Sequence, residues 1–247
     1  MDPVCFYIGA HPVFWYGIMV AAGFLACLAH LTILGIREGR DPGFGSDIAF
    51  WMMLTGIIGA RIAYVMANAS YYLNDPIAII RVDQGGLIYY GGFIGAFIAG
   101  IVFAKVKKLS ILALADFVVS ALPLGHFFGR LGCFLNACCY GAAASLPWSV
   151  FQQGAERHPV QLYEAFLNLA VYLLLIPAYR RRKRNGEVLA IYLIIYPLGR
   201  FMLEFLRGDE RLGWHGIAYA QIISLGLVLV GLILGLVLYA SRPKHVS

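Results

Sequence analysis

Three long stretches of this chain contain no charged side chain, and they limit what it can fold into. No Asp, Glu, Lys or Arg lies between Asp2 and Arg37, between Asp83 and Lys105, or between Arg211 and Arg242. A membrane-spanning helix needs about 20 largely apolar residues, and each stretch is long enough to supply one. Only 13% of the 247 residues are charged, against about 25% in soluble domains. These features exclude a soluble globular protein and predict an all-α integral membrane protein.

Apolar segments of helical length recur along the whole chain. We expect seven membrane-spanning helices, at 12–36, 47–69, 87–104, 110–129, 161–178, 187–206 and 216–240. They leave short loops and one longer irregular stretch near 130–160, which we expect on the outer face. The sequence has no repeat, no low-complexity tract and no appended soluble domain, so residues 1–247 are expected to form one polytopic transmembrane domain.

The basic residues outside these segments indicate how the helices are oriented. Twelve of the 19 Lys and Arg residues, including every lysine, follow the first, third, fifth or last segment. The densest run is Arg180–Arg184. Because cytoplasmic loops are enriched in Lys and Arg, we expect these loops and the C-terminus in the cytoplasm and the N-terminus outside.

The seven other basic residues are all arginines, expected in the outer half of the membrane or on its outer side. They are Arg61, Arg81, Arg130, Arg157, Arg200, Arg207 and Arg211. An arginine near hydrocarbon is usually paired or lines a wet cavity, and its guanidinium suits bidentate recognition of phosphate. Any one of them is equally well explained by an ion pair with Glu156, Glu164, Glu204 or Asp209, or by a side chain that extends to the lipid headgroups. For the set together we favour an anionic ligand approaching from the outer leaflet.

The segment from Tyr196 to Arg207 places four polar side chains on one helix face. At about 100° per residue, Tyr196, Arg200, Glu204 and Arg207 fall within an arc of about 80°. Such a stripe is very unfavourable against lipid, so we expect it to face the interior of the bundle. Arg200 and Glu204 can form an ion pair, which would leave Arg207 or Tyr196 for a ligand. The alternative is an ion-paired packing seam without a ligand.

The segment GHFFGRLGCFLNACCYG, residues 125–141, is rich in glycine around two polar side chains. Gly129 and Gly141 are among the glycines that permit exposed backbone amides. Together with Arg130 and Asn136, such amides suit a phosphate or an ester carbonyl. The alternative is a glycine-lined helix packing face.

Three other places hold further candidates. His158 begins the segment HPVQLYEA, where it is a candidate base or a structural cap beside a proline. Tyr16 lies early in the first segment and can equally belong to an interfacial aromatic belt. Arg61 and Tyr64 lie three residues apart, on neighbouring faces of the second segment.

Five segments occur in order over nearly the whole chain: VFWYGIMVAAGF (13–24), GGLIYYGGFIG (85–95), GHFFGRLGCFLNACCYG (125–141), HPVQLYEA (158–165) and YPLGRFMLEFLR (196–207). Together they resemble the prolipoprotein diacylglyceryl transferase family. The resemblance implies an enzyme of the bacterial inner (plasma) membrane, with its active site toward the outer leaflet. It implies transfer of the diacylglyceryl group of phosphatidylglycerol to the lipobox cysteine of a prolipoprotein, with glycerol phosphate as the second product. Its partners would be phosphatidylglycerol, prolipoproteins and membrane lipids; we expect no cofactor, no metal and no nucleic acid.

The resemblance also implies roles for particular residues. Arg130 matches the arginine that binds the phosphatidylglycerol headgroup, and Arg200 matches a second essential arginine. Residues of the same cavity are matched by Glu204, Tyr196, Tyr16 and Asn136. Fixed cations suit this reaction, because negative charge develops on the departing phosphate. From the patterns above we add as binding candidates Arg207, Arg61, Gly129 and Gly141.

Two features depart from the family pattern. A family histidine proposed to deprotonate the thiol stands here as Tyr90, and a tyrosine, with a pKa of about 10, is a poor base unless arginines lower that pKa. His158 is the other candidate base. An asparagine and an acidic residue of the family stand as Cys133 and Cys138, followed by Cys139. These cysteines can form a disulfide on an oxidising side or stay buried thiols, which we favour slightly.

Other functions stay open at this point. The departures also fit a divergent family member with another acceptor or without transferase activity. The cysteines fit a membrane thiol–disulfide protein, although that leaves the arginines unused. A metal site made from them with His126 or His158 lacks regular C-x-x-C spacing. A transporter of an organic anion would need inverted repeats, which the sequence lacks. We rank all of these below the transferase.

Overall fold

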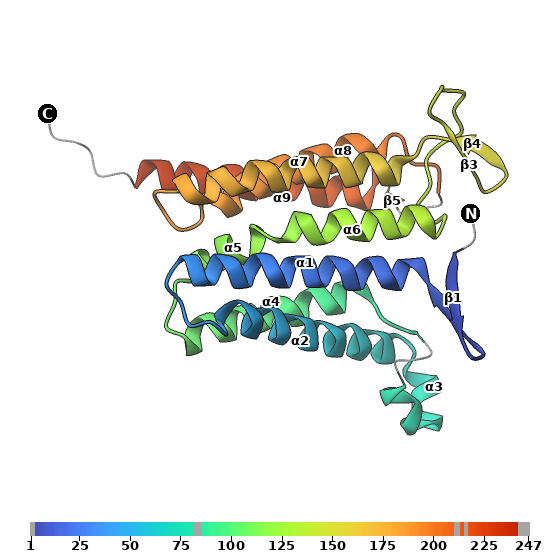
Figure 1. Cartoon of the computed structure of the whole chain (residues 1–247), viewed down its shortest axis with the longest axis horizontal. Helices are drawn as coiled ribbons and strands as arrows, with labels where there is room; N and C mark the ends of the chain where they lie inside the picture. The colour runs from blue at the N-terminus through green and yellow to red at the C-terminus, as the bar shows by residue number, and fades with distance from the viewer. Residues whose placement is uncertain (1–2, 82–84, 210–212, 215–216, 242–247) are drawn as a thin grey trace, which may run out of the picture. The chain divides into compact units, whose positions relative to one another are not determined.

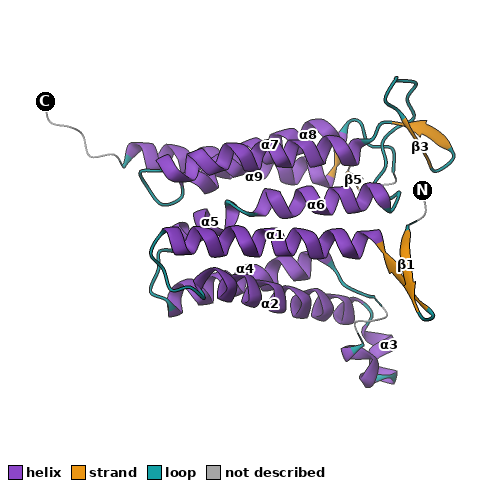
Figure 2. Cartoon of the chain, in the orientation of Figure 1, coloured by secondary structure: helices purple, strands orange, loops and turns teal. Residues whose placement is uncertain are grey.

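The computed structural model of the chain describes residues 3–81, 85–209, 213–214 and 217–241 (Figures 1 and 2). It contains two compact units: residues 1–29 with 116–247, and residues 30–115. Long helices dominate both units, as the charge-free stretches predict. The protein is therefore of the all-α, membrane-integral class.

Six helical segments among the described residues are long and apolar enough to cross a membrane. They are Trp15–Arg37 (α1), Phe44–Ala67 (α2), Tyr89–Val106 (α4), Ile111–Leu135 (α5 and α6), Val160–Arg181 (α7) and Tyr219–Ala240 (α9). Each coincides with one of the predicted segments. The remaining prediction, 187–206, corresponds to helix α8 (Glu187–Glu204), which has 18 residues and carries Glu187, Arg200 and Glu204. Because of these charges, α8 is not identified as a span by length and composition alone.

In the first unit, four helices lie alongside one another (Figure 1). Helix α6 packs on α7, α7 on α8, and α8 on α9. The first part of α1 contacts α6 through small residues. A Cβ placed on Gly23 would lie 3.0 Å from the Cβ of Phe128, and one on Gly132 would lie 3.2 Å from the Tyr16 ring. Small residues let membrane helices approach closely, so glycine packing does account for part of the 125–141 segment.

The predicted segment 110–129 is divided into two helices. Helix α5 (Ile111–Val119) ends before Ser120, and α6 (Leu122–Leu135) has Pro123 in its first turn. Proline lacks an N–H and fits the start of a helix, which explains the new start. Because α6 continues to Leu135, the stretch without helix runs from Asn136 to Pro159 rather than from 130.

Three short antiparallel hairpins, which the sequence did not predict, adjoin the helices of the first unit (Figure 2). They pair β1 (Val4–Ile8) with β2 (His11–Phe14), β3 (Val150–Gln152) with β4 (Ala155–Arg157), and β5 (Gly213–Trp214) with β6 (Ile217–Ala218). Between β3 and β4, Gln153 and Gly154 both have positive φ, 49° and 77°. Two such residues in a row are typical of the tight turns that favour hairpins.

In the second unit, α2 packs along α4 through glycines of both helices (Figure 1). A Cβ on Gly91 would overlap the carbonyl of Gly59, and one on Gly95 would overlap the carbonyl of Thr55. The glycines of the 85–95 segment therefore permit a close helix crossing. After α2 come a short helix, α3 (Ala69–Asn74), and a 3₁₀ helix, η1 (Pro76–Ile80).

A buried carboxylate in the first unit anchors the start of α8. Asp116, near the end of α5, is fully buried and accepts hydrogen bonds from the N–H groups of Gly186 (2.7 Å) and Leu189 (2.8 Å). The first N–H groups of a helix have no acceptor within it, so an outside carboxylate satisfies them and also complements the helix dipole. Gly186 has a φ of 101°, a conformation that favours glycine.

We expect Asp116→Ala to lower the thermal stability of the protein in detergent. The change leaves buried N–H groups of α8 without their acceptor, which costs about 1–3 kcal/mol. Thermal unfolding followed by tryptophan fluorescence measures the effect. The matched control is Asp47→Ala, because Asp47 is an aspartate in the first turn of a helix, α2, but is exposed. Equal melting temperatures for the two variants would contradict the anchoring role.

Candidate functional site

One face of α7 is both polar and buried. Gln161, Glu164 and Asn168 are each at most 1% exposed. Their spacing of three and four residues puts them on the same side of the helix. A buried carboxylate without partners costs several kcal/mol, so the neighbouring helices must supply donors to Glu164.

Glu164 has three polar partners on α6 and α8. Its Oε1 lies 3.0 Å from Nη2 of Arg130 and 3.7 Å from Nε of Arg200. The hydroxyl of Tyr196 donates a hydrogen bond to the same oxygen at 3.2 Å. Arg200 also pairs with Glu204, one turn further along α8, as the sequence predicts. We call these five residues the buried charge cluster.

The charges of the cluster balance, and its members differ in access. Arg130 and Arg200 offset Glu164 and Glu204, which explains how four ionised groups are tolerated among apolar helices. The two glutamate side chains are 2% exposed and that of Arg200 is 13% exposed, whereas that of Arg130 is 24% exposed. A ligand therefore reaches the cluster most readily at Arg130.

The sequence predicts that Arg207 or Tyr196 is left for a ligand, whereas both have protein partners. Tyr196 donates to Glu164 and stacks on Tyr192, with 5.4 Å between ring centroids. Arg207, just after α8, donates from Nε and Nη2 to the two carboxylate oxygens of Asp209 at 2.9 and 2.5 Å. The physical reason is that a largely buried guanidinium needs a counter-charge even without a ligand. The ion-pair explanation thus holds for Arg130, Arg200 and Arg207, three of the six arginines of this set that the structure describes.

The stretch after α6 is fixed by backbone hydrogen bonds on two sides. The N–H of Ala142 donates to the Leu206 carbonyl (2.8 Å), and the N–H of Gly208 donates to the Tyr140 carbonyl (3.1 Å). On the other side, the N–H of His158 donates to the Ala142 carbonyl at 3.0 Å. Residues 140–144 therefore connect the end of α8 with the start of α7. These are the helix ends near which Glu204 and Glu164 of the buried charge cluster lie.

The remaining arginines of the predicted outer set differ from one another. Arg157 donates to the carbonyls of Gln152 (2.9 Å) and Gly141 (3.2 Å) and lies over the Tyr140 ring at 4.5 Å. It holds the β3–β4 turn and the adjacent stretch together. Arg81 is exposed, and Arg211 lies outside the described residues.

Gly141, Gly129 and His158 have different surroundings. A Cβ on Gly141 would overlap the carbonyl of His158, so glycine is required for this close approach. A Cβ on Gly129 would meet no described atom within 4 Å, and the backbone next to Arg130 is correspondingly open. The His158 side chain is half-buried, with Nδ1 3.5 Å from the Tyr163 hydroxyl.

Tyr16 of α1 lies beside the last turns of α6, and Asn136 is the residue at which α6 ends. The Tyr16 ring contacts Gly132, and its hydroxyl interacts electrostatically with Arg130. Asn136 caps α6 and donates its N–H to the Gly132 carbonyl at 2.9 Å. These two predicted residues therefore lie in the same unit as the buried charge cluster.

Three cysteines come together at the same place. The Sγ atoms of Cys133, Cys138 and Cys139 lie within 4.8 Å of one another, and in the described part of the chain they are free thiols. We call them the three-cysteine cluster. Ala137 and Cys139 have positive φ, 51° and 57°, and this turns the chain back on itself. Gln161 donates a hydrogen bond to the Cys138 carbonyl at 2.8 Å and fixes the turn.

Positive charge influences these thiols. Hydrogen bonds from the thiols of Cys133 and Cys138 lower the pKa of Cys139 below its ordinary value. The charges of Arg207 and Arg130 lower it further, against the effect of burial. The two guanidinium groups therefore favour the thiolate form of Cys139.

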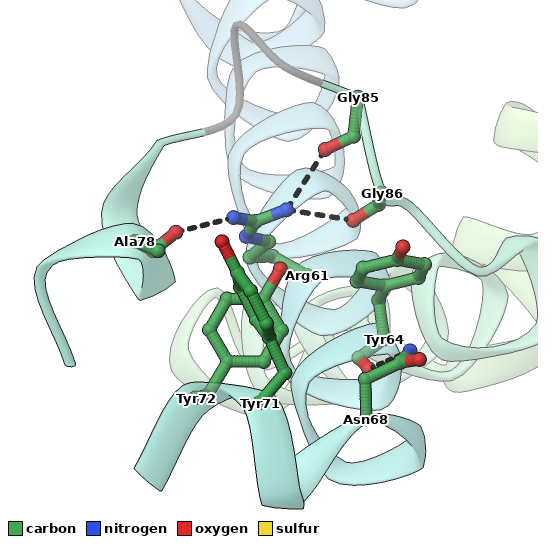
Figure 3. A pocket seen from close by; sticks show the side chains of 8 residues that line it. All are labelled: Arg61, Tyr64, Asn68, Tyr71, Tyr72, Ala78, Gly85 and Gly86. Atoms are coloured by element: carbon green, nitrogen blue, oxygen red, sulfur yellow. Dashed lines mark hydrogen bonds between the residues drawn. The ribbon is translucent and has the colours of Figure 1, made fainter. Parts of the chain in front are cut away.

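In the second unit, Arg61 binds backbone carbonyls with all five of its N–H donors. The acceptors, at 2.6–3.0 Å, are the carbonyls of Ile79, Gly85, Gly86, Ala78 and Arg81. Figure 3 shows the guanidinium in a pocket beside the rings of Tyr64, Tyr71 and Tyr72. A phosphate at Arg61 would have to displace these bonds, so the geometry favours a loop-holding role over the predicted ligand-binding one.

Tyr90, the other candidate base, also belongs to the second unit. It lies in the first turn of α4 and is 63% exposed, with its ring centroid 5.9 Å from that of Tyr89. Its hydroxyl is therefore open to a partner from outside the unit.

The central residue of the buried charge cluster, Glu164, was not among the predicted site residues. The sequence does contain a signal for it. Gln161, Glu164 and Asn168 repeat at helical spacing in an otherwise apolar segment, as the stripe from Tyr196 to Arg207 does. Two polar stripes on two apolar helices are expected to face each other, because neither can face lipid.

Comparison with known proteins identifies relatives along the whole chain. The model of the family described as prolipoprotein diacylglyceryl transferase matches residues 3–237. The chain is similar to three curated proteins that each carry the name phosphatidylglycerol–prolipoprotein diacylglyceryl transferase. It is 34% identical over 251 residues to that of Clostridioides difficile (strain 630), with 100% of this chain and 99% of the relative covered. It is 36% identical over 256 residues to that of Pseudoalteromonas translucida (strain TAC 125), with 98% and 94% covered. It is 36% identical over 249 residues to that of Campylobacter lari (strain RM2100), with 94% and 92% covered.

We expect Glu164→Ala to be strongly destabilising. It removes the carboxylate shared by Arg130 and Arg200, and breaking a buried ion pair typically costs about 3–5 kcal/mol. Thermal unfolding in detergent measures the loss. Glu156→Ala is the control, because Glu156 is an exposed glutamate of the same unit. A Glu164→Ala protein that melts with the control would rule out the central role of this carboxylate.

We expect Arg61→Lys to destabilise the second unit. A lysine ammonium has three donors at one point and cannot reach five carbonyls. The part-buried carbonyls, and the buried carbonyl of Ala78, therefore lose partners at a cost of about 1–3 kcal/mol. Hydrogen exchange of the Ala78–Arg81 backbone should become faster, as mass spectrometry of peptides from this region would detect. Arg81→Lys, at an exposed arginine, should change neither property. Unchanged exchange in Arg61→Lys would contradict the loop-holding role.

Proposed function

The chain belongs to the prolipoprotein diacylglyceryl transferase family, and on this premise we propose that it transfers the diacylglyceryl group of phosphatidylglycerol to the lipobox cysteine thiol of prolipoproteins. This reaction is the first step of bacterial lipoprotein maturation. The observation that carries the proposal for this chain is the buried charge cluster. It holds two arginines together between three apolar helices, and one of these arginines, Arg130, is accessible.

We propose that α8 is a seventh membrane span, so that residues 1–247 form one polytopic domain. The pairing of Arg200 with Glu204 and Glu164 supports this, because it directs the charges of α8 toward protein rather than lipid. The basic loops support an N-terminus outside and a C-terminus in the cytoplasm. The C-terminal basic residues, Arg242 and Lys244, lie outside the part of the chain that the structure describes. From membership of the family we also propose that the membrane is the bacterial inner membrane. The buried charge cluster is proposed to open toward its outer leaflet.

In this proposal, Arg130 binds the phosphate of phosphatidylglycerol. It is the most accessible arginine of the cluster, and its guanidinium can present two donors to a phosphate. Arg200 supplies the second positive charge and is oriented by Glu204. The open backbone at Gly129 leaves room for the headgroup beside Arg130.

The reaction forms one bond and breaks one. The sulfur of the lipobox cysteine attacks the glycerol carbon that carries the phosphate, and a thioether C–S bond forms. The C–O bond to the phosphate breaks, and glycerol phosphate leaves with the electron pair. Arg130 and Arg200 stabilise the charge that develops on the departing phosphate, and they do so more strongly in a largely dry site than in water.

The thiol proton must be removed, because the thiolate is the nucleophile. His158 and Tyr90 are the proposed bases. Asn136, Tyr16 and Tyr196 are proposed to position the glycerol and the acyl chains. Arg207 and Gly141 are proposed to support the site indirectly, by holding residues 140–144 in place. A direct contact of Arg207 with the substrate is not proposed, because its guanidinium is paired with Asp209.

We expect Arg130→Ala to lower the transfer rate by about 10²–10³-fold, as removal of a fixed donor to a developing anion does. Arg130→Lys should recover little, because a lysine lacks the two-pronged guanidinium. The assay combines purified protein, phosphatidylglycerol and a synthetic lipobox peptide, and mass spectrometry detects the diacylglyceryl gain of the peptide. Arg180→Ala, at an exposed arginine at the far end of α7, is the control and should be fully active.

Two outcomes would count against the proposal. A near-normal rate for Arg130→Lys would overturn the assignment of the headgroup to Arg130. Absence of any mass gain for the unaltered protein, while a known transferase works in the same tube, would make the chain a divergent member of the family. The three-cysteine cluster would then be the next place to test for activity.

A further inference from the structure

The transfer reaction gives no role to the three-cysteine cluster, although its geometry is specific. The three Sγ atoms lie within 4.8 Å of one another. Three sulfurs bound to one zinc ion at about 2.3 Å are about 3.8 Å apart in tetrahedral geometry. Small side-chain rotations therefore bring all three sulfurs of Cys133, Cys138 and Cys139 to bonding distance of a common centre.

We propose that Cys133, Cys138 and Cys139 form a binding site for a single thiophilic cation of the d¹⁰ class, Zn²⁺ or Cu⁺. Thiolates are soft ligands that select these two ions over Mg²⁺, Ca²⁺ or Mn²⁺. Three ligands suit Cu⁺ directly, and they suit Zn²⁺ with a water molecule in the fourth position. The proposal is independent of the transferase activity.

The turn that carries the cysteines is held in shape by the protein. Ala137 and Cys139 occupy the left-handed region, a strained conformation for residues other than glycine. Gln161, itself 1% exposed, donates its side-chain N–H to the Cys138 carbonyl at 2.8 Å and to Oε1 of Gln152 at 3.1 Å. Because the backbone of the turn is fixed from α7, little ordering is left for a bound cation to impose.

The charges around the cluster favour an occupied site. Three thiolates with Zn²⁺ carry a net charge of −1, and with Cu⁺ a net charge of −2. Arg130 interacts electrostatically with both Cys133 and Cys139, and Arg207 interacts with Cys139. Two guanidinium groups near an anionic metal–thiolate group stabilise it, in the way that partners around a metal site commonly do.

Binding involves proton release and no change of oxidation state. Each S–H bond breaks as a metal–sulfur bond forms, and the three protons pass to the buffer. No oxidant or reductant is consumed. Affinity is therefore expected to fall as the pH is lowered.

The cluster has no C-x-x-C pattern, and this is why the sequence does not predict a metal. In the sequence, the segment from Cys133 to Cys138 cannot be distinguished from an ordinary helix end followed by a loop. The left-handed residues at 137 and 139 reverse the chain, and the reversal brings the sulfurs together.

The test uses the full-length protein, purified in detergent with a reductant that does not bind metals, and stripped of metal. Zn²⁺ and Cu⁺ are titrated in separate arms against a chromophoric chelator, and bound metal is counted by mass spectrometry of the elements. Co²⁺ serves as a spectroscopic probe of the zinc arm, since thiolate ligation produces an intense charge-transfer band. We expect one cation per chain in at least one arm.

Variants identify the ligands. Cys138→Ser and Cys139→Ser should each weaken binding by at least about tenfold and lower the intensity of the cobalt–thiolate band, because one of the three thiolates is lost. Cys5→Ser removes a cysteine outside the cluster and should leave binding unchanged. Melting temperatures of the metal-free variants identify any that fail to fold.

A second measurement needs no variant. In the unaltered protein, the cation should slow alkylation of Cys138 and Cys139 but not of Cys5, as peptide mass spectrometry can resolve. The proposal is overturned if the reduced protein binds neither cation, if a Cys138→Ser, Cys139→Ser double variant binds as well as the unaltered protein, or if the cation leaves alkylation of both cysteines unchanged.

Discussion

A single buried carboxylate oxygen largely determines how three helices of the first unit can be arranged. Oε1 of Glu164, on α7, receives Arg130 from α6 and both Tyr196 and Arg200 from α8. Ionised groups among apolar helices are tolerated only in balanced sets, so the three helices must be arranged to bring these side chains together. The charges that allow α8 to lie within the bundle are the same charges that form the candidate site.

The sequence predicts the membrane class and most helix positions, because charge-free stretches and their lengths are local properties. It predicts the pairing of Arg200 with Glu204 for the same reason, since both lie on one helix face. It does not predict that Glu164 is central, because that depends on which helix packs against which. It likewise misses the short hairpins, whose strands of two to five residues carry too little pattern to be distinguished from loops.

Residues of one type serve different purposes in different places. Among the arginines predicted to lie on the outer side, Arg61 and Arg157 hold backbone carbonyls. Arg207 pairs with a nearby aspartate, and Arg130 and Arg200 share a buried glutamate. Composition and spacing treat them alike and therefore overestimate the number available to a ligand. Within the buried charge cluster, Arg130 differs from Arg200 in its remaining access, and access is a property of the folded protein.

If Arg130 binds the phosphate as proposed, its pairing with Glu164 has a consequence for turnover. A phosphate that binds Arg130 exchanges one counter-ion for another, so its affinity reflects the difference between two ion pairs rather than the full strength of one. The resident carboxylate competes again for the guanidinium as soon as the product begins to leave. An internal competitor of this kind prevents tight trapping of either phospholipid or glycerol phosphate, and it also keeps a buried positive charge compensated whenever the site is empty.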